Sequence, residues 1–261
     1  MQSTVSKNDG KTFYKKDGPN GFQKCVIFTV MKNTLFLFLF SLFFVACGDG
    51  LSTSKNNSKD SEGNGFMTDS RDGQTYKIVQ IGSQTWMAQN LNYKTAGSNC
   101  YNNRANNCAK YGRFYTWAAA MDSVGKWDKS GNGCGYGKTC SPSYPVRGVC
   151  PAGWHLPSKT EWETLFDAVG GQSTASTKLK SKSGWYSNGN GTDAFGFSAL
   201  PAGYRYYIGS DYGEGDGASF WSSTEDSSDG AYHMYLDCYR DNAFLYYYSK
   251  NYGFSVRCVK D

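Results

Sequence analysis

The chain has 261 residues, a formal net charge of +5 and a mean hydropathy of −0.58, values typical of a soluble body with one or two domains. Six Lys and two Asp lie in residues 1–46, so the rest of the chain is close to neutral, and the absence of a basic stripe argues against nucleic-acid binding. With 31 Gly, 20 Tyr and 7 Trp, we expect a turn-rich fold whose core uses large rings.

A continuous apolar run, residues 35–46, ends directly before Cys47 and is interrupted only by Ser41. The run is shorter than the about 20 residues that a membrane-spanning helix needs, and it has the length of a signal-peptide core. The tetrapeptide Phe-Val-Ala-Cys resembles a bacterial lipobox, although Phe44 stands where Leu is usual. A buried core helix would need polar positions that the run lacks. We therefore expect a lipoprotein signal peptide at residues 31–46 and lipidation at Cys47.

This assignment divides the remainder of the chain. Residues 31–46 form a complete short signal peptide, so residues 1–30 are predicted to be an N-terminal extension from a misplaced start codon. Residues 47–66 are rich in Gly, Ser, Asn, Lys and Asp and predict a flexible tether. Residues 67–261 are the expected folded domain. The expected location is the cell envelope, through a lipid anchor in the outer membrane that faces the periplasm or the cell surface.

The first part of the domain predicts a β-hairpin. Residues 76–81 alternate between apolar and polar side chains, Gly82 and Ser83 form a turn signal, and residues 84–88 predict the returning strand. A long irregular section follows, in which only residues 118–121 indicate a short helix.

The clearest helix signal begins at Ser158. Ser158 and Glu161 have the spacing of a capping box, in which each side chain accepts a hydrogen bond from the other residue's backbone N–H. An apolar stripe at helical period follows, made of Trp162, Leu165, Phe166 and Val169. Gly170 and Gly171 can end the helix. We expect this helix to be the main element on which the sheet packs.

The C-terminal part alternates between strand and turn signals. The region from residue 178 to 191 is expected to be a loop, and five strand-like runs follow at residues 197–206, 219–223, 231–236, 243–248 and 253–259. Two short helices with a mostly antiparallel sheet and long loops predict an α+β domain.

Seven cysteines belong to the domain once Cys25 and Cys47 are set aside. An exported domain lies in an oxidising compartment, which favours disulfides over zinc, and the chain has no Cys-x-x-Cys and only two histidines. The expected disulfides are Cys100–Cys108, Cys134–Cys140 and Cys150–Cys258, with Cys238 unpaired. The last one would close a loop of about a hundred residues, which stabilises a fold by about 4–5 kcal/mol in the chain-entropy model.

No residue pattern predicts catalysis. His155 and His233 have no Ser or Cys nucleophile at a recognisable spacing, Glu161 is explained by helix capping and Glu163 by solvation. No catalytic residue and no resident cofactor are therefore predicted.

Two patterns indicate binding instead. Asp211, Glu214 and Asp216 share one glycine-rich loop and could hold calcium through oxygen ligands, although a solvated turn accounts for the same residues. A second pattern is a group of rings that could stack on a sugar or a protein partner: Tyr204, Tyr206, Tyr207, Tyr212 and the run Tyr246–Tyr248. Packing between neighbouring strands explains these tyrosines equally well.

Long motifs of the domain resemble a known family. Among them are Asp72-Gly-Gln-Thr-Tyr-Lys-Ile-Val-Gln-Ile-Gly, Arg147-Gly-Val-Cys-Pro-Ala-Gly-Trp-His-Leu-Pro and Gly253-Phe-Ser-Val-Arg-Cys-Val. They resemble the Fibrobacter succinogenes major paralogous domain over residues 67–261. The resemblance implies an exported protein, often a lipoprotein, and a biochemical role that the family does not define.

A more distant resemblance joins the helix start and the C-terminal motif to formylglycine-generating (sulfatase-modifying) enzymes. It implies a C-type-lectin-like fold. Those enzymes use a close pair of C-terminal cysteines to bind copper, whereas Cys238 and Cys258 lie far apart in this sequence.

The expected function is therefore that of a lipid-anchored envelope protein. Its C-type-lectin-like domain would serve binding or adhesion without catalysis, with a glycan or an envelope protein as its partner. The alternatives are an enzyme related to formylglycine-generating oxidases and a structural surface-display protein without a small ligand.

Overall fold

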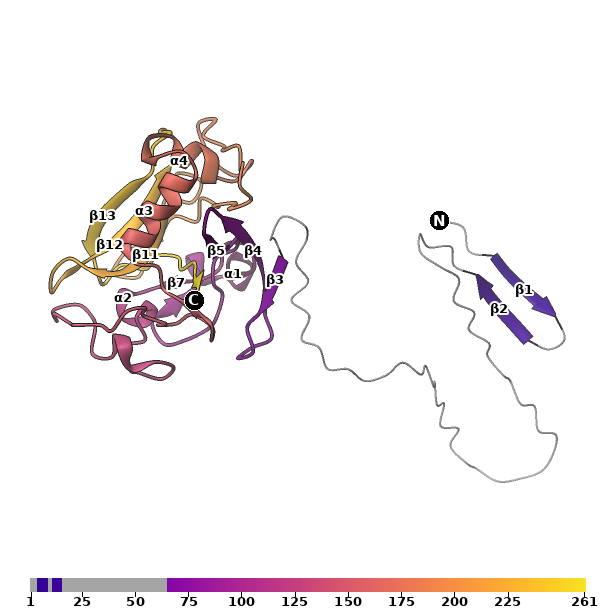
Figure 1. Cartoon of the computed structure of the whole chain (residues 1–261), viewed down its shortest axis with the longest axis horizontal. Helices are drawn as coiled ribbons and strands as arrows, with labels where there is room; N and C mark the ends of the chain where they lie inside the picture. The colour runs from indigo at the N-terminus through magenta and orange to yellow at the C-terminus, as the bar shows by residue number, and fades with distance from the viewer. Residues whose placement is uncertain (1–3, 9–10, 16–64) are drawn as a thin grey trace, which may run out of the picture. The chain divides into compact units, whose positions relative to one another are not determined.

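The computed structural model describes residues 4–8, 11–15 and 65–261, and the chain divides into two units between Thr53 and Ser54. In the first unit, β1 (Thr4–Asn8) pairs with β2 (Lys11–Lys15) in antiparallel orientation. The expected signal peptide, Cys47 and nearly all of the expected tether lie outside the described residues. The second unit contains the expected domain, drawn in colour from residue 65 onward in Figure 1.

One sheet contains strands from both the N-terminal and the C-terminal parts of the domain. Its strand order is β3 (Gly65–Thr68), β4 (Thr75–Ile81), β5 (Gln84–Met87), β14 (Val259–Lys260) and β8 (Trp154–His155), with every neighbouring pair antiparallel. The expected hairpin is confirmed as β4 and β5, with Gly82 at a φ of 59° in the turn. Gly65 and Phe66 were expected in the tether but belong to β3.

A second sheet is a three-stranded antiparallel meander. It consists of β11 (Gly217–Glu225), β12 (Gly230–Asp237) and β13 (Phe244–Ser249), which confirms three of the expected strand-like runs. The runs at 197–206 and 253–259 contain only short strands. Their residues instead form single bridges to several different neighbours, such as Arg205 with Gly253 and Phe220 with Ser255. Pro201 contributes to this irregularity because it has no backbone N–H to donate to a neighbouring strand.

Two smaller sheets complete the strands of the domain. In one, β9 (Tyr204–Arg205) pairs with β10 (Asp211–Tyr212), and in the other β6 (Ser98–Asn99) pairs with β7 (Phe114–Tyr115). The α-helices are α1 (Ala105–Tyr111), α2 (Trp117–Ala120), α3 (Lys159–Ala168) and α4 (Gln172–Leu179), and the 3-10 helices are η1 (Tyr101–Asn103) and η2 (Lys129–Gly131). Within the described ranges, no helix has the length and apolar character required to cross a membrane.

The expectation of two helices was wrong because α1 and α4 have weak local signals. α1 contains two Asn and α4 contains two Ser and two Thr, residues with low helix propensity, and neither helix has a side-chain N-cap. Tertiary contacts stabilise them instead. A disulfide ties α1 to Cys100, and the backbone N–H of Ser176 in α4 donates to the carbonyl of Asp241.

The predicted helix α3 is confirmed, with its capping box between Ser158 and Glu161. All four members of its apolar stripe are at most 2% exposed. Figure 1 shows α3 beside the sheet of β11, β12 and β13, and its stripe belongs to the same core cluster as Phe220 and Met234. A separate core cluster contains Trp117, Trp154 and Trp221 and no residue of α3, so the helix organises one of two main cores.

The three disulfides join Cys100 to Cys108, Cys134 to Cys140 and Cys150 to Cys258, the same pairs that the sequence predicted. Cys150 lies before β8 and Cys258 before β14, so the third disulfide spans 108 residues and reinforces the sheet that joins the ends of the domain.

Replacing Leu165 by Ala tests the core assignment of α3. Since the Leu165 side chain is fully buried, the substitution is expected to lower the free energy of unfolding by about 2–5 kcal/mol. Urea unfolding followed by circular dichroism would measure this loss. Thr164→Ala, on the exposed side of the same helix, is the control and should change stability by less than about 0.5 kcal/mol. Equal stability of Leu165→Ala and the unmodified protein would contradict the assignment.

Candidate functional site: a tyrosine-lined pocket

The two faces of the β11–β12–β13 sheet differ in what covers them. Side chains alternate between the faces of a strand, so Phe220 and Met234 point to one face and Trp221, His233 and Tyr246 to the other. The first face packs against α3. The second face lies against the C-terminal segment that contains Phe254.

A cavity of about 230 Å³ lies on this second face. Its lining, here called the tyrosine pocket, consists of Tyr204, Ser219, His233, Tyr235, Tyr246, Tyr248 and Phe254. Ser219, His233 and Phe254 are buried and form its inner part. Tyr246 and Tyr248 are 49% and 44% exposed, so their rings form the accessible rim.

The rings of the pocket contact one another closely. The His233 ring lies 4.6 Å from that of Phe254 at an interplanar angle of 32°, and 5.8 Å from that of Tyr248 at 74°. The Tyr248 ring in turn lies 4.6 Å from Tyr252. Such tilted and edge-to-face pairs are favourable arrangements of aromatic rings, so they hold the rim residues in defined orientations.

Of the predicted tyrosines, Tyr204 lines the pocket, and Tyr206 and Tyr212 lie beside it in one continuous group of rings. The Tyr204 ring lies 6.0 Å from that of Tyr212, and the Tyr206 ring lies 4.9 Å from that of Tyr252. Tyr207, whose ring centroid lies 4.4 Å from that of Tyr206, is 58% exposed and extends the group outward. The structure therefore brings Tyr204, Tyr206 and Tyr212 together.

Sequence reasoning did not identify Tyr252 or Phe254 as members of the site. Both lie far along the chain from Tyr204, and the contacts that join them are single bridges, such as that between Arg205 and Gly253. The run Tyr246–Tyr248 did carry a signal, because strand alternation places Tyr246 and Tyr248 on one face and Tyr247 on the other.

The tyrosine pocket is uncharged. Burial lowers the pKa of His233 to about 3, so its imidazole is neutral at physiological pH. Burial also raises the pKa of Tyr235 to about 12 and raises that of Tyr204, so these phenols keep their protons. None of the lining residues is Asp, Glu, Lys or Arg. The Nδ1 atom of His233 is buried and has no hydrogen-bond partner among the described residues.

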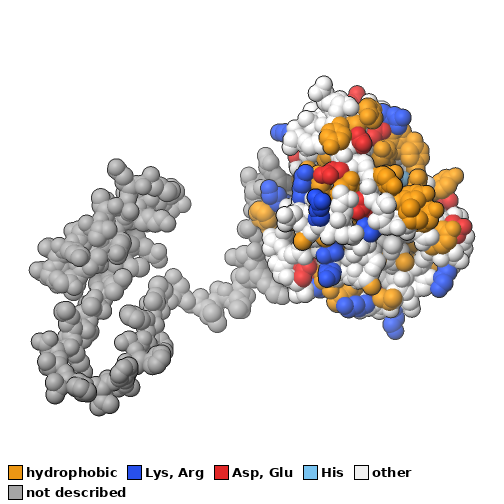
Figure 2. All heavy atoms as spheres, turned by 180° about the vertical axis from the view of Figure 1, so that it is seen from behind, with side chains coloured by type: hydrophobic (Ala, Val, Ile, Leu, Met, Phe, Trp, Pro, Cys, Tyr) orange, Lys and Arg blue, Asp and Glu red, His pale blue; other side chains and the backbone are white. Residues whose placement is uncertain are grey.

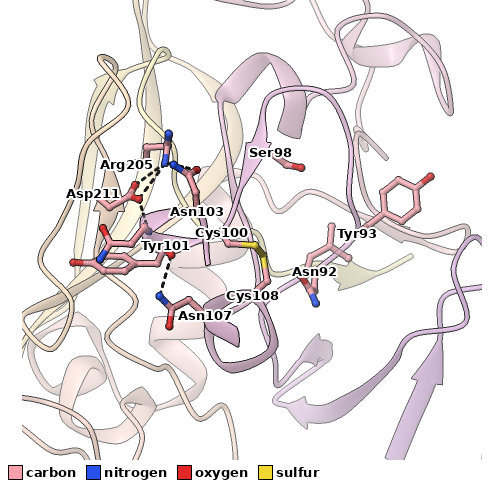
Figure 3. The surroundings of a disulfide bond; sticks show 12 residues. Asn92, Tyr93, Ser98, Cys100, Tyr101, Asn103, Asn107, Cys108, Arg205 and Asp211 are labelled. Carbon is pink, nitrogen blue, oxygen red and sulfur yellow. Dashed lines mark hydrogen bonds and ion pairs between the residues drawn. A yellow bond between two sulfur atoms is a disulfide. The ribbon is translucent and has the colours of Figure 1, made fainter. Parts of the chain in front are cut away.

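The loop expected to hold calcium does not gather its three carboxylates. The Asp211 carboxylate accepts hydrogen bonds from Nη1 of Arg205, at 3.1 and 3.2 Å, and from the backbone N–H of Asn102 at 2.6 Å. Figure 3 shows this ion pair beside the Cys100–Cys108 disulfide. The arginine already neutralises Asp211 and ties β9 and β10 to η1.

The other two carboxylates have different partners. Glu214 accepts a hydrogen bond from the Tyr111 hydroxyl at 2.8 Å and lies 3.7 Å from Nζ of Lys110, both in α1. Asp216 lies next to Cys238, whose sulfur is 3.9 Å from Oδ1. Across the described part of the chain, no group of three or more His, Cys, Asp or Glu side chains is arranged to hold a metal ion. The geometry does not support the calcium expectation.

His155 lies between two carboxylates that hold its ring in place. Its Nε2 lies 2.7 Å from Oε1 of Glu161, and its Nδ1 lies 2.7 Å from Oδ1 of Asp261. Burial lowers the pKa of His155, but these two hydrogen bonds outweigh that effect, so its pKa lies above the ordinary value of 6.5. Burial would raise the pKa of Glu161, but its bonds to His155 and Ser158 bring it below the ordinary value of 4.5.

The cysteines near the C-terminus do not form a reactive pair. Cys258 is bonded to Cys150, and Cys238 is a buried free thiol, the one free cysteine within residues 65–261.

The fold and the site first define a class: an α+β domain with few helices, antiparallel sheets and three disulfides, which carries a cluster of surface tyrosines. The chain belongs to the Fibrobacter succinogenes major domain family, whose family model matches residues 79–260. The resemblance carried by the long motifs is therefore confirmed. No curated protein and no solved structure matches the chain.

A pH-dependent stability experiment tests the role of His155. Because the folded pKa of His155 is raised, its stabilising effect is present below about pH 6.5 and is lost as the pH rises through the folded pKa. The partner Glu161 has a lowered pKa, so its contribution is present above about pH 4.5 and is lost as the pH falls. His155→Gln should therefore destabilise the protein more at about pH 5.5 than at about pH 9.

Urea unfolding of both proteins at the two pH values would measure the difference. Glu163→Gln, on the surface of the same helix, is the control and should have a small effect at both pH values. An equal loss of stability for His155→Gln at both pH values would show that its protonation contributes nothing.

Proposed function

We propose that this chain is a lipid-anchored envelope protein whose domain binds a neutral glycan at the tyrosine pocket and catalyses no reaction. The observation that carries this proposal is an uncharged cavity of rings whose rim, Tyr246 and Tyr248, is open to solvent. Figure 2 shows hydrophobic side chains, the class in which tyrosine is coloured, in groups on the right-hand part of the folded domain.

The chemistry of a sugar ring matches this surface. A pyranose has a face of C–H groups bordered by hydroxyls, and a tyrosine offers a flat apolar ring that ends in a hydroxyl. Tyrosine also provides a large contact area with few rotatable bonds, so little side-chain entropy is lost on binding. The rim tyrosines are already held by contacts with their neighbours, such as Phe244 under Tyr246 at 5.1 Å.

The size and polarity of the pocket indicate how such a ligand would bind. The cavity of about 230 Å³ is below the about 300–1,000 Å³ of pockets for drug-sized ligands, so it suits a single sugar ring. Further units of a chain would lie over the adjacent rings of Tyr206, Tyr207 and Tyr212. Ser219 and His233 line the pocket, and Nδ1 of His233 has no partner among the described residues, so these two side chains would bond hydroxyls of the bound sugar ring.

The same groups favour binding over catalysis. A general base works best with a pKa near the working pH, whereas burial lowers the pKa of His233 to about 3. The lining has no carboxylate and no thiol. An oxidase mechanism with two neighbouring thiols has no counterpart either, because Cys258 is in a disulfide and Cys238 is buried alone.

The proposal includes a C-type-lectin-like fold and attachment through Cys47. Support for the fold comes from the motifs shared with formylglycine-generating enzymes and from the mixture of a capped helix, antiparallel strands and disulfide-braced loops. Support for export comes from the apolar run before Cys47 and from three disulfides, which persist in oxidising compartments.

Removing the rim of the pocket tests glycan binding. The double substitution Tyr246→Ala and Tyr248→Ala removes two stacking rings, each worth about 0.5–1.5 kcal/mol, so binding should weaken about fivefold or more. A neutral glycan array, followed by calorimetry on the ligand it identifies, would measure the change. The control is Tyr247→Ala on the opposite face of the same strand, which should bind like the unmodified protein. Absence of any glycan ligand, or equal weakening by the control, would refute the proposal.

Substituting Cys47 by Ser tests the lipid anchor. The unmodified protein, expressed from residue 31 in a bacterial host, should incorporate radiolabelled palmitate and partition into the detergent phase of Triton X-114. Cys47→Ser should lose the label and move to the aqueous phase, whereas Cys25→Ser in the full chain should change neither property. Retention of the label after Cys47→Ser would contradict the anchor.

A further inference from the structure

A second hollow of the domain, of about 550 Å³, has a different character from the tyrosine pocket. It is bordered by the turn after β3, the segment 92–94, α1 and the start of β7, and its lining includes Arg71, Asn92, Lys94 and Arg113. The Cys100–Cys108 disulfide forms part of its wall. Figure 3 shows Asn92 and Tyr93 next to this disulfide. We call this hollow the arginine site.

Three buried polar atoms of the arginine site have no hydrogen-bond partner among the described residues. They are Nη1 of Arg71, Nε of Arg113 and Oδ1 of Asn92. Folded proteins nearly always satisfy buried polar atoms, with protein groups, water or a ligand. All three atoms belong to residues that line one hollow, so two buried donors and one buried acceptor lack a protein partner there, although the three residues lie in different segments of the chain.

The Arg71 guanidinium is held by its neighbours, while its Nη1 atom has no hydrogen-bond partner among the described residues. Its Nε and Nη2 donate to the buried carboxylate of Asp69, at 2.9 and 2.6 Å, and its plane lies 3.9 Å from the centre of the Tyr93 ring. The Arg71 side chain is only 7% exposed. A guanidinium fixed on two sides presents its remaining N–H groups in one direction, which lowers the entropy lost when a ligand binds.

The charge around the hollow is positive. Asp69 neutralises Arg71, but Arg113 and Lys94 form no ion pair within the described ranges. The one carboxylate in the lining, Asp72, accepts hydrogen bonds from the backbone and side chain of Gln74.

An adjoining cavity adds to the positive charge around the arginine site. It has a volume of about 310 Å³, and it shares Gln74, Asn92 and Cys108 with the arginine site. Its lining includes Lys77, Lys110 and Arg257 and no Asp or Glu. Figure 2 shows a group of Lys and Arg side chains on the left-hand part of the domain, the side of β3 and β4.

We infer that the arginine site binds the carboxylate of an acidic sugar, a hexuronate unit. Guanidinium groups form strong, directional hydrogen bonds to carboxylates, which satisfies the free donors of Arg71 and Arg113. The free oxygen of Asn92 requires a donor, and a hydroxyl of the same sugar supplies one. Sulfate, which is fully ionised at neutral pH, offers acceptors only and would leave Asn92 unsatisfied. This inference is independent of the tyrosine pocket, because it concerns different residues and a charged ligand.

A titration of the mature protein tests the inference. Galacturonate and glucuronate are added to the ¹⁵N-labelled protein, in parallel with galactose, glucose and inorganic sulfate. The uronates should shift the side-chain Nε–H signals of Arg71 and Arg113 and should bind at least tenfold more tightly than the neutral sugars and sulfate. Binding should weaken as salt is raised, because the ion pair is screened.

Two variants assign the binding to the site. Arg113→Gln should weaken uronate binding at least tenfold, whereas Arg240→Gln, which removes the same charge from an exposed residue outside the site, should leave it unchanged. Arg113 is chosen over Arg71 because losing Arg71 would leave Asp69 buried without its partner. If Arg113→Gln fails to fold, the Nε–H shifts of the unmodified protein decide the question.

Three results would overturn the inference: uronates that bind no better than their neutral parents, sulfate that binds as tightly as a uronate, or an equal effect of Arg240→Gln. The rim substitutions Tyr246→Ala and Tyr248→Ala should leave uronate binding intact, so failure of the tyrosine pocket can be told apart from failure of the arginine site.

Discussion

The pairing of the C-terminal segment with the rest of the domain is the constraint on which the structure depends. Val259 pairs with Trp86 on one side and His155 on the other, and Cys258 is bonded to Cys150. Just before them, Phe254 pairs with Tyr115 and contributes a wall of the tyrosine pocket. The last ten residues therefore contribute both to the main sheet and to the candidate site.

Buried cations show how the domain treats charge in its interior. Arg257 is 1% exposed, and it donates to Oδ1 of Asn90 and to the carbonyls of Phe197 and Ser198. Burial lowers its pKa to about 9, which still leaves it charged at physiological pH. Lys250 is equally buried and donates to Glu225 and to two carbonyls. These two cations are satisfied within the protein. The open donors of Arg71 and Arg113 differ from them, which is why the arginine site indicates a ligand.

The two candidate sites of the domain differ in charge. One is an uncharged pocket of rings, and the other is a cationic hollow with open hydrogen-bonding atoms. A glycan that contains both neutral and acidic units would supply a ligand for each. The rigid frame for both is the same, because single bridges, disulfides and ring contacts connect the loops that carry them.

The sequence by itself determined the elements whose signals are local. The capping box and apolar stripe of α3, the β4–β5 hairpin and the strands β11 to β13 all depend on neighbours within a few residues. The Cys100–Cys108 and Cys134–Cys140 pairs followed from short spacings, and the Cys150–Cys258 pair from the positions of its cysteines before the helix and on the last strand. The long motifs were sufficient to identify the family.

Only the tertiary structure decided the rest. Helices α1 and α4 are stabilised by contacts with other segments of the chain, and intrinsic helix propensity does not include such contacts. The acidic loop looked like a cation site, but Arg205 and α1 supply the partners of Asp211 and Glu214. The arginine site joins residues from several separate segments, and whether a buried N–H has a partner depends on which loops meet around it. Such juxtapositions arise from long-range packing, so a pattern along the chain cannot contain them.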